Sequence, residues 1–156
     1  MKRPANIALL CGAAAVILSC IIMLNLLKND TTMEILTGTY GGKIYRYSFD
    51  TESLEFTLLE NVGAENASYA IKDAGNIYAV SETGDASGAY SFSVGSQTAM
   101  TADKRQTGAD PCFIMKYDDR ILTADYSGGS VTVFPLIEGS LGDSIQKLDF
   151  QGSGPV

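Results

Sequence analysis

The candidate chemistry of this 156-residue chain rests on carboxylates, because the chain contains no histidine. Histidine is the commonest general base and the commonest metal ligand. The 156 residues alone therefore cannot support a mechanism that needs a histidine. Glu82 and Asp125 each follow a short apolar run. A carboxylate at the end of a strand can hold a polar ligand or transfer a proton, and the alternative for both residues is a solvated place in a turn.

Charge and composition narrow the function further. The formal charge is -7, and such a surface repels a phosphodiester backbone, so nucleic-acid binding is disfavoured. Tryptophan is absent, which argues against a WD-type repeat. No Cys-x-x-Cys pair is present, so no zinc site is predicted, and we expect neither a metal nor a cofactor. Cys112 has no histidine to activate it and is expected to be a small buried hydrophobic residue.

Residues 1–32 form a predicted signal or membrane-anchor segment. Lys2 and Arg3 precede a run from Ile7 to Leu27 that contains no charged residue. At about 1.5 Å per residue, a helix of this length crosses a bilayer core of about 30 Å. The straightforward prediction is an N-terminal apolar helix that spans the membrane through residues 7–27 with its basic end inside.

Two alternatives stay open for this segment. Ile17–Cys20 resembles a bacterial lipobox, in which Cys20 would be lipidated, although Ile21–Leu27 stays apolar where a polar tether is usual. The anchor and the lipobox both place the protein in the cell envelope. The second alternative is translation from Met33, which directly precedes the first β-like segment and would give a cytoplasmic product.

From residue 34 onward, short apolar runs alternate with turns rich in Gly, Asn, Asp and Ser, and no long helical period appears. The first three predicted strands are Glu34–Tyr40, Lys43–Phe49 and Leu54–Leu59, with a turn at Asp50–Ser53. Strands in close succession with tight turns predict an antiparallel meander. Four aromatic residues are expected in the core: Tyr45, Tyr47, Tyr90 and Phe92.

Two motifs recur 44 residues apart in the rest of the chain. Ile77–Val80 is matched by Ile121–Ala124, and Asn66–Tyr69 is matched by Asp110–Phe113. A four-stranded unit that repeats every ~40–50 residues is typical of a β-propeller, because one twisted sheet cannot cover its own faces and neighbouring blades cover them. An antiparallel sandwich is the alternative, but the fixed offset favours the propeller.

The predicted fold is therefore all-β, an incomplete β-propeller over residues 33–156. The repeat register assigns the first three strands to the second, third and fourth strands of a blade whose first strand must come from elsewhere. The residues up to Thr107 form one full blade and Asp110–Phe150 a second, which gives two blades and a partial one. Propellers have about four to eight blades, so this part cannot close a ring alone.

Several of these segments, in order and spacing, resemble the seven-bladed lactonase propellers, which include bacterial 6-phosphogluconolactonases and muconate-lactonising enzymes. The most specific matching segments are Gly108–Cys112 and Ala124–Pro135. The other matching segments are Gly38–Tyr40, Gly42–Tyr47, Ile77–Glu82, Gly139–Gly142 and Gly152–Pro155. The resemblance covers about residues 34–155. Ser81 and Asp125 depart from it, because the family usually has Asn at these places.

The resemblance implies hydrolysis of a sugar-acid lactone, with 6-phosphogluconolactone as the expected substrate. In the family, a His-x-His element at the start of an innermost strand contributes to the active-site cleft. Asn66 and Ser68, and likewise Asp110 and Cys112, take the equivalent positions in the repeat of this chain. Together with the two strand-end carboxylates, the predicted substrate-binding residues are Asn66, Glu82, Asp110 and Asp125. The alternative for Asp110 is a cap on the turn before Pro111.

The catalytic residues of the family are expected beyond Val156, because its His-x-His element follows the Gly-Pro pair that ends here and its catalytic Glu and Arg lie further on. We therefore expect this chain alone to be an inactive fragment, and the resemblance requires no metal. The alternative function is a non-catalytic cell-envelope propeller that binds protein or glycan. Gly128 and Gly129 are expected to form a turn and not a phosphate loop, because no helix follows them.

Overall fold

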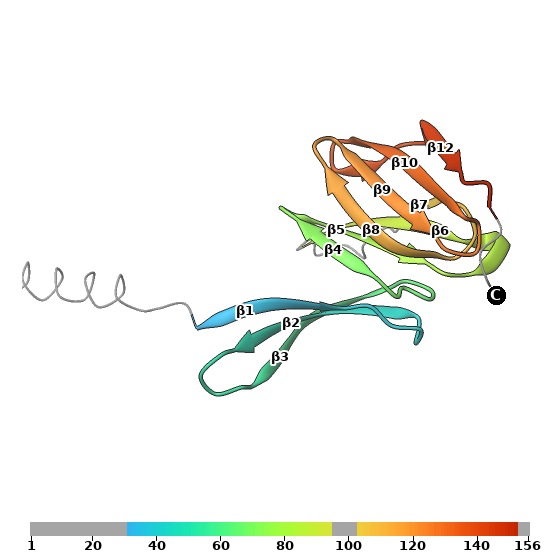
Figure 1. Ribbon diagram of the computed structural model, residues 1–156. Coiled ribbons are helices and arrows are strands. Elements are labelled where there is room, and N and C mark those ends of the chain that lie inside the picture. Colours follow the sequence, from blue (N-terminus) through green and yellow to red (C-terminus); the bar gives the residue numbers. More distant parts are fainter. Residues whose placement is uncertain (1–30, 95–102, 153–156) are drawn as a thin grey trace, which may run out of the picture. The chain divides into compact units, whose positions relative to one another are not determined.

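A computed structural model of the chain describes residues 31–94 and 103–152 (Figure 1). Apart from the short 3₁₀ turn η1 (Gly84–Ala86), all regular structure in these residues is β-strand. The apolar helix predicted for residues 7–27 and the lipidation candidate Cys20 lie outside the described residues. Within them, no helix is long and apolar enough to cross a membrane.

The described strands form three sheets, which we call blades I, II and III. Blade I contains β1 (Thr32–Thr37), β2 (Lys43–Asp50) and β3 (Phe56–Gly63). Blade II contains β4 (Ala70–Asp73), β5 (Asn76–Ser81), β6 (Gly88–Ser93) and β7 (Asp103–Gln106). Blade III contains β8 (Pro111–Tyr117), β9 (Arg120–Asp125) and β10 (Ser130–Ile137), and both β11 (Ser140–Leu141) and β12 (Gln146–Asp149) pair with β10. The all-β prediction is confirmed, and blade I has three described strands in sequential order, as the repeat register predicted.

The repeat is also present in the backbone conformation. Asn66 and Asp110, 44 residues apart, both have a positive φ, of 47° and 49°. Ala74 and Asp118, at the same spacing, have φ values of 48° and 54°. The N–H of Glu82 donates to the Asn66 carbonyl at 3.0 Å, and the equivalent N–H 44 residues later donates to the Asp110 carbonyl at 2.9 Å. Blades II and III are therefore built on one template, which the sequence offset detected.

The strand boundaries of blade I differ from the prediction at every end except the start of β2 at Lys43. β1 ends at Thr37, and the next residue, Gly38, packs so closely on the segment that links β3 to β4 that a Cβ there would collide with the Ala67 carbonyl oxygen. β3 begins only at Phe56, because the preceding turn is longer than its sequence suggests. The Asp50 carboxylate accepts the N–H groups of Glu52 and Ser53 at 2.8 and 3.0 Å, and Leu54 continues the turn with φ 60°.

The core lies between the blades, and β5 is buried on both of its faces. One cluster joins blades I and II through Ile44, Val62, Ala64, Ala67, Ile77, Ala79 and Phe92. A second cluster joins blades II and III through Tyr78, Val80, Ala89, Ile114, Ile121, Phe134 and Leu141. Successive side chains of a strand point to opposite faces, so β5 contributes to both clusters in turn. This explains why its sequence is a continuous apolar run without polar alternation.

The predicted core aromatics occupy two environments. Phe92 is buried. Tyr90 packs against the first cluster, and the centroids of the Tyr90 and Phe92 rings lie 5.5 Å apart. Tyr45 and Tyr47 are half-buried and stack on each other at 6.1 Å. Strand alternation puts them on the face of blade I opposite Ile44, so the core prediction holds for Phe92 and only in part for these tyrosines.

The outer face of blade III carries the same apolar pattern that blade II uses to contact blade III. Phe113 and Met115 remain about two-fifths exposed on this face, at 42% and 41%. With Leu122, Ala124 and Val131 among its walls, they line a shallow hollow of about 180 Å³. The residues at the equivalent positions of β5 are buried against blade III, so this face of blade III fits a further sheet of the same kind.

We expect Phe134→Ala to destabilise the full-length protein by about 3–5 kcal/mol, because a fully buried ring at the contact of blades II and III is lost. The measurement is urea denaturation followed by circular dichroism. Tyr117→Ala, at a position 68% exposed, is the control and should change the free energy of unfolding by about 0.5 kcal/mol or less. Equal effects of the two substitutions would contradict the assigned interblade core.

Candidate functional site

The connections of the three blades gather their polar residues at one end of the sheets. Successive antiparallel strands place every second connection at the same end. The loops after β1, β5 and β9 therefore share an end with the segments that link β3 to β4 and β7 to β8. We call this end the loop end. It holds Tyr40, Asn66, Ser68, Glu82, Asp110 and Ser127.

Glu82 is the centre of a hydrogen-bonded group that joins blades I and II. The Tyr40 hydroxyl donates to its Oε2 at 2.8 Å, and the Ser68 hydroxyl donates to its Oε1. The side-chain amide of Asn66 donates to the backbone carbonyl of Glu82 at 2.9 Å, which fixes the loop that carries it. The hydrogen bond to Glu82 raises the pKa of Tyr40 above its usual value, so this phenol stays protonated and remains a donor at neutral pH.

Asp110 joins blades II and III in the neighbouring part of the loop end. Its Oδ1 accepts the Gly84 N–H at 2.8 Å, and its own N–H donates to the Ser87 hydroxyl at 2.9 Å. Hydrogen bonds from the Ser127 hydroxyl and from the Gly84 N–H lower the pKa of Asp110, so it is ionised at neutral pH. Asp110 therefore holds the loop of the blade before it, in addition to starting the turn before Pro111.

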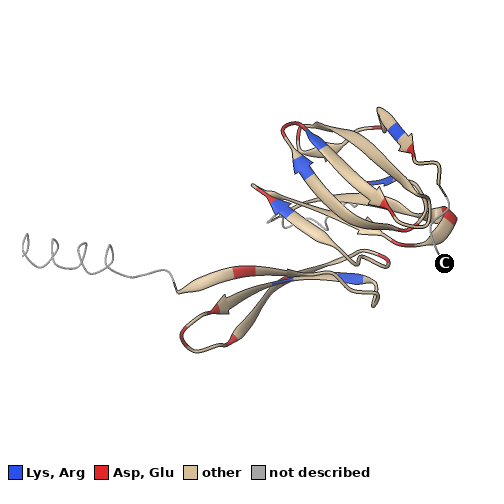
Figure 2. Ribbon diagram, in the orientation of Figure 1, with Lys and Arg blue, Asp and Glu red and all other residues tan. Residues whose placement is uncertain are grey.

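The two loop-end carboxylates form no ion pair with a basic side chain of the described residues. No Lys or Arg nitrogen of residues 31–94 and 103–152 lies within 4.0 Å of the Glu82 or Asp110 carboxylate, whereas other acidic residues do form such pairs. Figure 2 shows how acidic residues are distributed among the turns of the blades. A loop end with two such carboxylates attracts hydrogen-bond donors, such as sugar hydroxyls, and repels anions.

Asp125 lies apart from this group, inside blade III. It is 2% exposed, and its Oδ2 accepts the Gly108 N–H at 3.0 Å and the Ser130 and Thr132 hydroxyls at 2.8 Å each. Its Oδ1 accepts the Thr123 hydroxyl at 2.8 Å. Because these internal donors engage both oxygens, we leave Asp125 out of the candidate site and assign it a structural role.

The prediction that Cys112 is buried is wrong, because the structure places this thiol in an exposed position. Pro111 pairs with Asp125 and Phe113 pairs with Ala124, so the strand pairing skips Cys112. Such a bulge leaves its extra residue unpaired, which the composition of the segment does not reveal. Gly128 and Gly129 form a turn, as predicted, with φ 55° at the second glycine.

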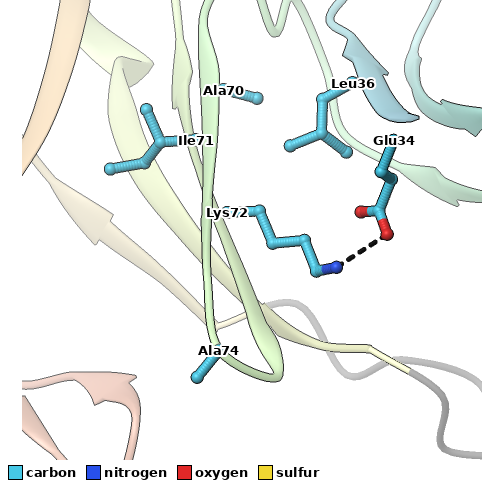
Figure 3. A pocket seen from close by; sticks show the side chains of 6 residues that line it. All are labelled: Glu34, Leu36, Ala70, Ile71, Lys72 and Ala74. Atoms are coloured by element: carbon cyan, nitrogen blue, oxygen red, sulfur yellow. Dashed lines mark hydrogen bonds and ion pairs between the residues drawn. The ribbon is translucent and has the colours of Figure 1, made fainter. Parts of the chain in front are cut away.

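A hollow of about 590 Å³ lies between β1 and β4 (Figure 3). Its charged residues are Glu34 and Lys72, whose side chains pair at 2.7 Å and neutralise one another. One of its lining residues, Ala74, belongs to the turn from β4 to β5. The hollow therefore lies toward the end of the sheets opposite the Glu82 loop. Its remaining lining is aliphatic, so it offers no group suited to ester chemistry.

Comparison with known proteins identifies the family. Residues 34–156 match the model of the family described as Lactonase, 7-bladed beta-propeller. The chain belongs to this lactonase family. The three described sheets are accordingly blades of a lactonase propeller.

Two solved structures are similar to this lactonase-family chain in fold and sequence. A candidate 6-phosphogluconolactonase from Bacteroides fragilis is 33% identical with a TM-score of 0.75, over 82% of this chain and 39% of that one. A candidate 6-phosphogluconolactonase from Bacteroides uniformis is 30% identical with a TM-score of 0.73, over 81% of this chain and 40% of that one. The chain thus spans about two-fifths of the length of these structures.

A structure from Lactobacillus plantarum shares the fold at 23% identity and a TM-score of 0.66, over 80% of this chain and 39% of that one. Among curated proteins, none matches the sequence of the chain.

The loop end of the chain contains residues that the sequence alone did not single out as site residues. Tyr40 and Ser127 were part of matching segments only, and Ser87 lay in none of them. Tyr40 lies in the loop after β1, as Glu82 does after β5, and this common place in the repeat was the available signal. In the described part of the chain, no group of three or more His, Cys, Asp or Glu residues is arranged to hold a metal ion.

We expect Asp125→Ala to destabilise the full-length protein by about 3 kcal/mol or more, because three buried hydroxyls lose their acceptor and the Gly108 N–H loses one of its two. Asp125→Asn should cost about 1 kcal/mol or less, since an amide oxygen can replace Oδ2 while the amide nitrogen donates to Thr123. Thermal denaturation of the full-length variants measures both. A loss for Asn as large as that for Ala would contradict the assigned hydrogen-bond pattern.

The ion pairs around Glu34 predict a loss of stability in acid. Burial alone raises the pKa of Glu34, but hydrogen bonds from Lys72 and Arg46 outweigh it and hold the pKa below 4.5. A lowered folded-state pKa means that the stabilisation is present above the unfolded value and is lost as the pH falls through the folded value.

Glu34→Gln should therefore lower the free energy of unfolding by about 1 kcal/mol or less at pH 7, and the difference from wild type should shrink below pH ~4. Urea titrations across this pH range measure it. The exposed Glu52→Gln is the control, and a Glu34→Gln difference that grew on acidification would oppose the assignment.

Proposed function

We propose that the full-length protein hydrolyses a sugar-acid lactone, with 6-phosphogluconolactone as the first substrate to test. The observation that carries the proposal is the match of residues 34–156 to the lactonase family. The two similar structures from Bacteroides species, both candidate 6-phosphogluconolactonases, support this choice of substrate.

The chemistry needs groups of two kinds. Water adds to the carbonyl carbon of the ring ester while a base takes its proton, and a donor stabilises the oxyanion that forms. The ring C–O bond then breaks and the departing oxygen takes a proton, which gives the open hydroxy acid. In this proposal Glu82 and Asp110 accept hydrogen bonds from the substrate, Asn66 holds the Glu82 loop, and the base comes from other parts of the ring.

The same proposal includes the cellular location. Residues 7–27 would hold the protein in the cell envelope as an apolar anchor, or Cys20 would do so as a lipidated residue. The run between the basic residues at the N-terminus and Lys28, which contains no charged side chain, supports this placement.

We expect the full-length protein to accelerate the disappearance of 6-phosphogluconolactone above its spontaneous hydrolysis, measured as acid release in a pH-stat. A polypeptide restricted to residues 34–156 should give only the spontaneous rate, because it lacks histidine and most of the ring. If the folded full-length protein accelerated the opening of no sugar-acid lactone, the proposal would be overturned in favour of a non-catalytic propeller that binds protein or glycan.

A further inference from the structure

We propose that Glu82, positioned by Tyr40 and Ser68, is a specificity-determining residue that binds neutral hydroxyl groups of the lactone and keeps a substrate phosphate away from this sector of the ring. The inference rests on the proposed function and adds to it the part of the substrate that this sector contacts. Tyr40 and Ser68 act as positioning residues, since they act on the substrate through Glu82.

The first argument is the orientation of the carboxylate. Tyr40 donates to one oxygen of Glu82 and Ser68 to the other, and the two donors come from blade I and from the segment that enters blade II. The Tyr40 ring is 65% exposed, so burial does not fix its position and the hydrogen bond to Glu82 does. Each carboxylate oxygen can accept more than one hydrogen bond. The carboxylate is therefore held in one orientation and still has lone pairs for a ligand.

The second argument is the charge of the donors and of the surroundings. Both donors to Glu82 are neutral hydroxyls, and no basic side chain among the described residues forms an ion pair with it. The charge of Asp110 also reaches this group, because it contributes to the raised pKa of Tyr40. Two carboxylates that form no ion pair and act on one region favour hydroxyl donors and oppose a phosphate dianion.

The third argument is what the alternatives would require. A phosphate subsite needs Lys or Arg side chains, or a cluster of free backbone N–H groups, aimed at the anion. At the loop end the Gly84 N–H already donates to Asp110, and the Thr83 N–H donates to Ser87. The Glu82 N–H donates to the Asn66 carbonyl. These N–H donors are occupied within the protein. The ammonium of Lys104 donates to the Ser81 and Thr83 hydroxyls at 3.1 and 3.5 Å, and it forms no ion pair with Glu82.

The test compares the full-length protein and its variants on two substrates, 6-phosphogluconolactone and the unphosphorylated glucono-1,5-lactone. Glu82→Gln should lower kcat/KM for glucono-1,5-lactone about tenfold, mainly through KM, because a charge-assisted hydrogen bond is weakened. The loss for the phosphorylated lactone should be smaller, because a repulsive charge is removed at the same time. The preference for the phosphorylated lactone should rise about threefold or more, and an unchanged or opposite preference overturns the proposal.

Milder variants and matched controls separate positioning from folding. Tyr40→Phe and Ser68→Ala should shift the preference in the same direction by a smaller factor, with melting temperatures near that of wild type. Glu65→Gln removes one carboxylate from an exposed place in the same linking segment and should leave both kcat/KM values unchanged. If Glu65→Gln shifted the preference as much as Glu82→Gln, the effect would come from net charge and the proposal would fail.

A binding measurement keeps this inference distinct from the proposed function. Calorimetric titration with glucono-1,5-lactam, a neutral analogue that resists ring opening, should give a Kd that Glu82→Gln raises about tenfold. Lactam binding that depends on Glu82 without any lactone turnover would overturn the lactonase proposal and support this one. The Glu82 proposal would be overturned if the protein turned over the lactone but its Kd for the lactam did not depend on Glu82. It would also be overturned if the lactam did not bind at all.

Discussion

The architecture depends on the burial of β5 on both of its faces. A single twisted sheet leaves both of its faces in water, and each face needs a neighbouring sheet to cover it. Ile77 and Ala79 are buried toward blade I, whereas Tyr78 and Val80 are buried toward blade III. This two-sided burial stacks the three blades in sequence order. It also explains why the outer face of blade III and the tyrosine face of blade I, which lack such cover among the described residues, carry large apolar side chains.

The stacking of the blades determines where the polar residues meet. Because the strands alternate in direction, each connection between two blades returns to the end where the loops of both blades already lie. Glu82 reaches back to blade I through Tyr40, and Asp110 reaches back to blade II through Gly84. The loop end is thus a chain of contacts between adjacent blades, so the orientation of each carboxylate depends on a blade other than its own.

The sequence was sufficient for the fold and for part of the candidate site. The 44-residue offset identified the blades, because it aligns β5 with β9 and Asn66 with Asp110. Periodicity could not reveal the bulge that exposes Cys112 or the internal donors that surround Asp125, since both depend on pairing with other strands. Tyr40 was missed for the same reason, because its contact with Glu82 exists only after two blades have packed together. Local sequence patterns predict the strands and turns, whereas contacts between blades are known only from the tertiary structure.

The two interblade cores also differ in a way that affects assembly. The contact of blades I and II brings small residues such as Ala64 and Ala67 against Phe92. The contact of blades II and III includes Tyr78, whose hydroxyl donates to the Gly139 carbonyl at 2.9 Å. If repeats packed out of order, this hydroxyl would lose its partner on blade III. The blades share a template yet are not interchangeable, and this difference guards a repeat protein against misassembly while the chain folds.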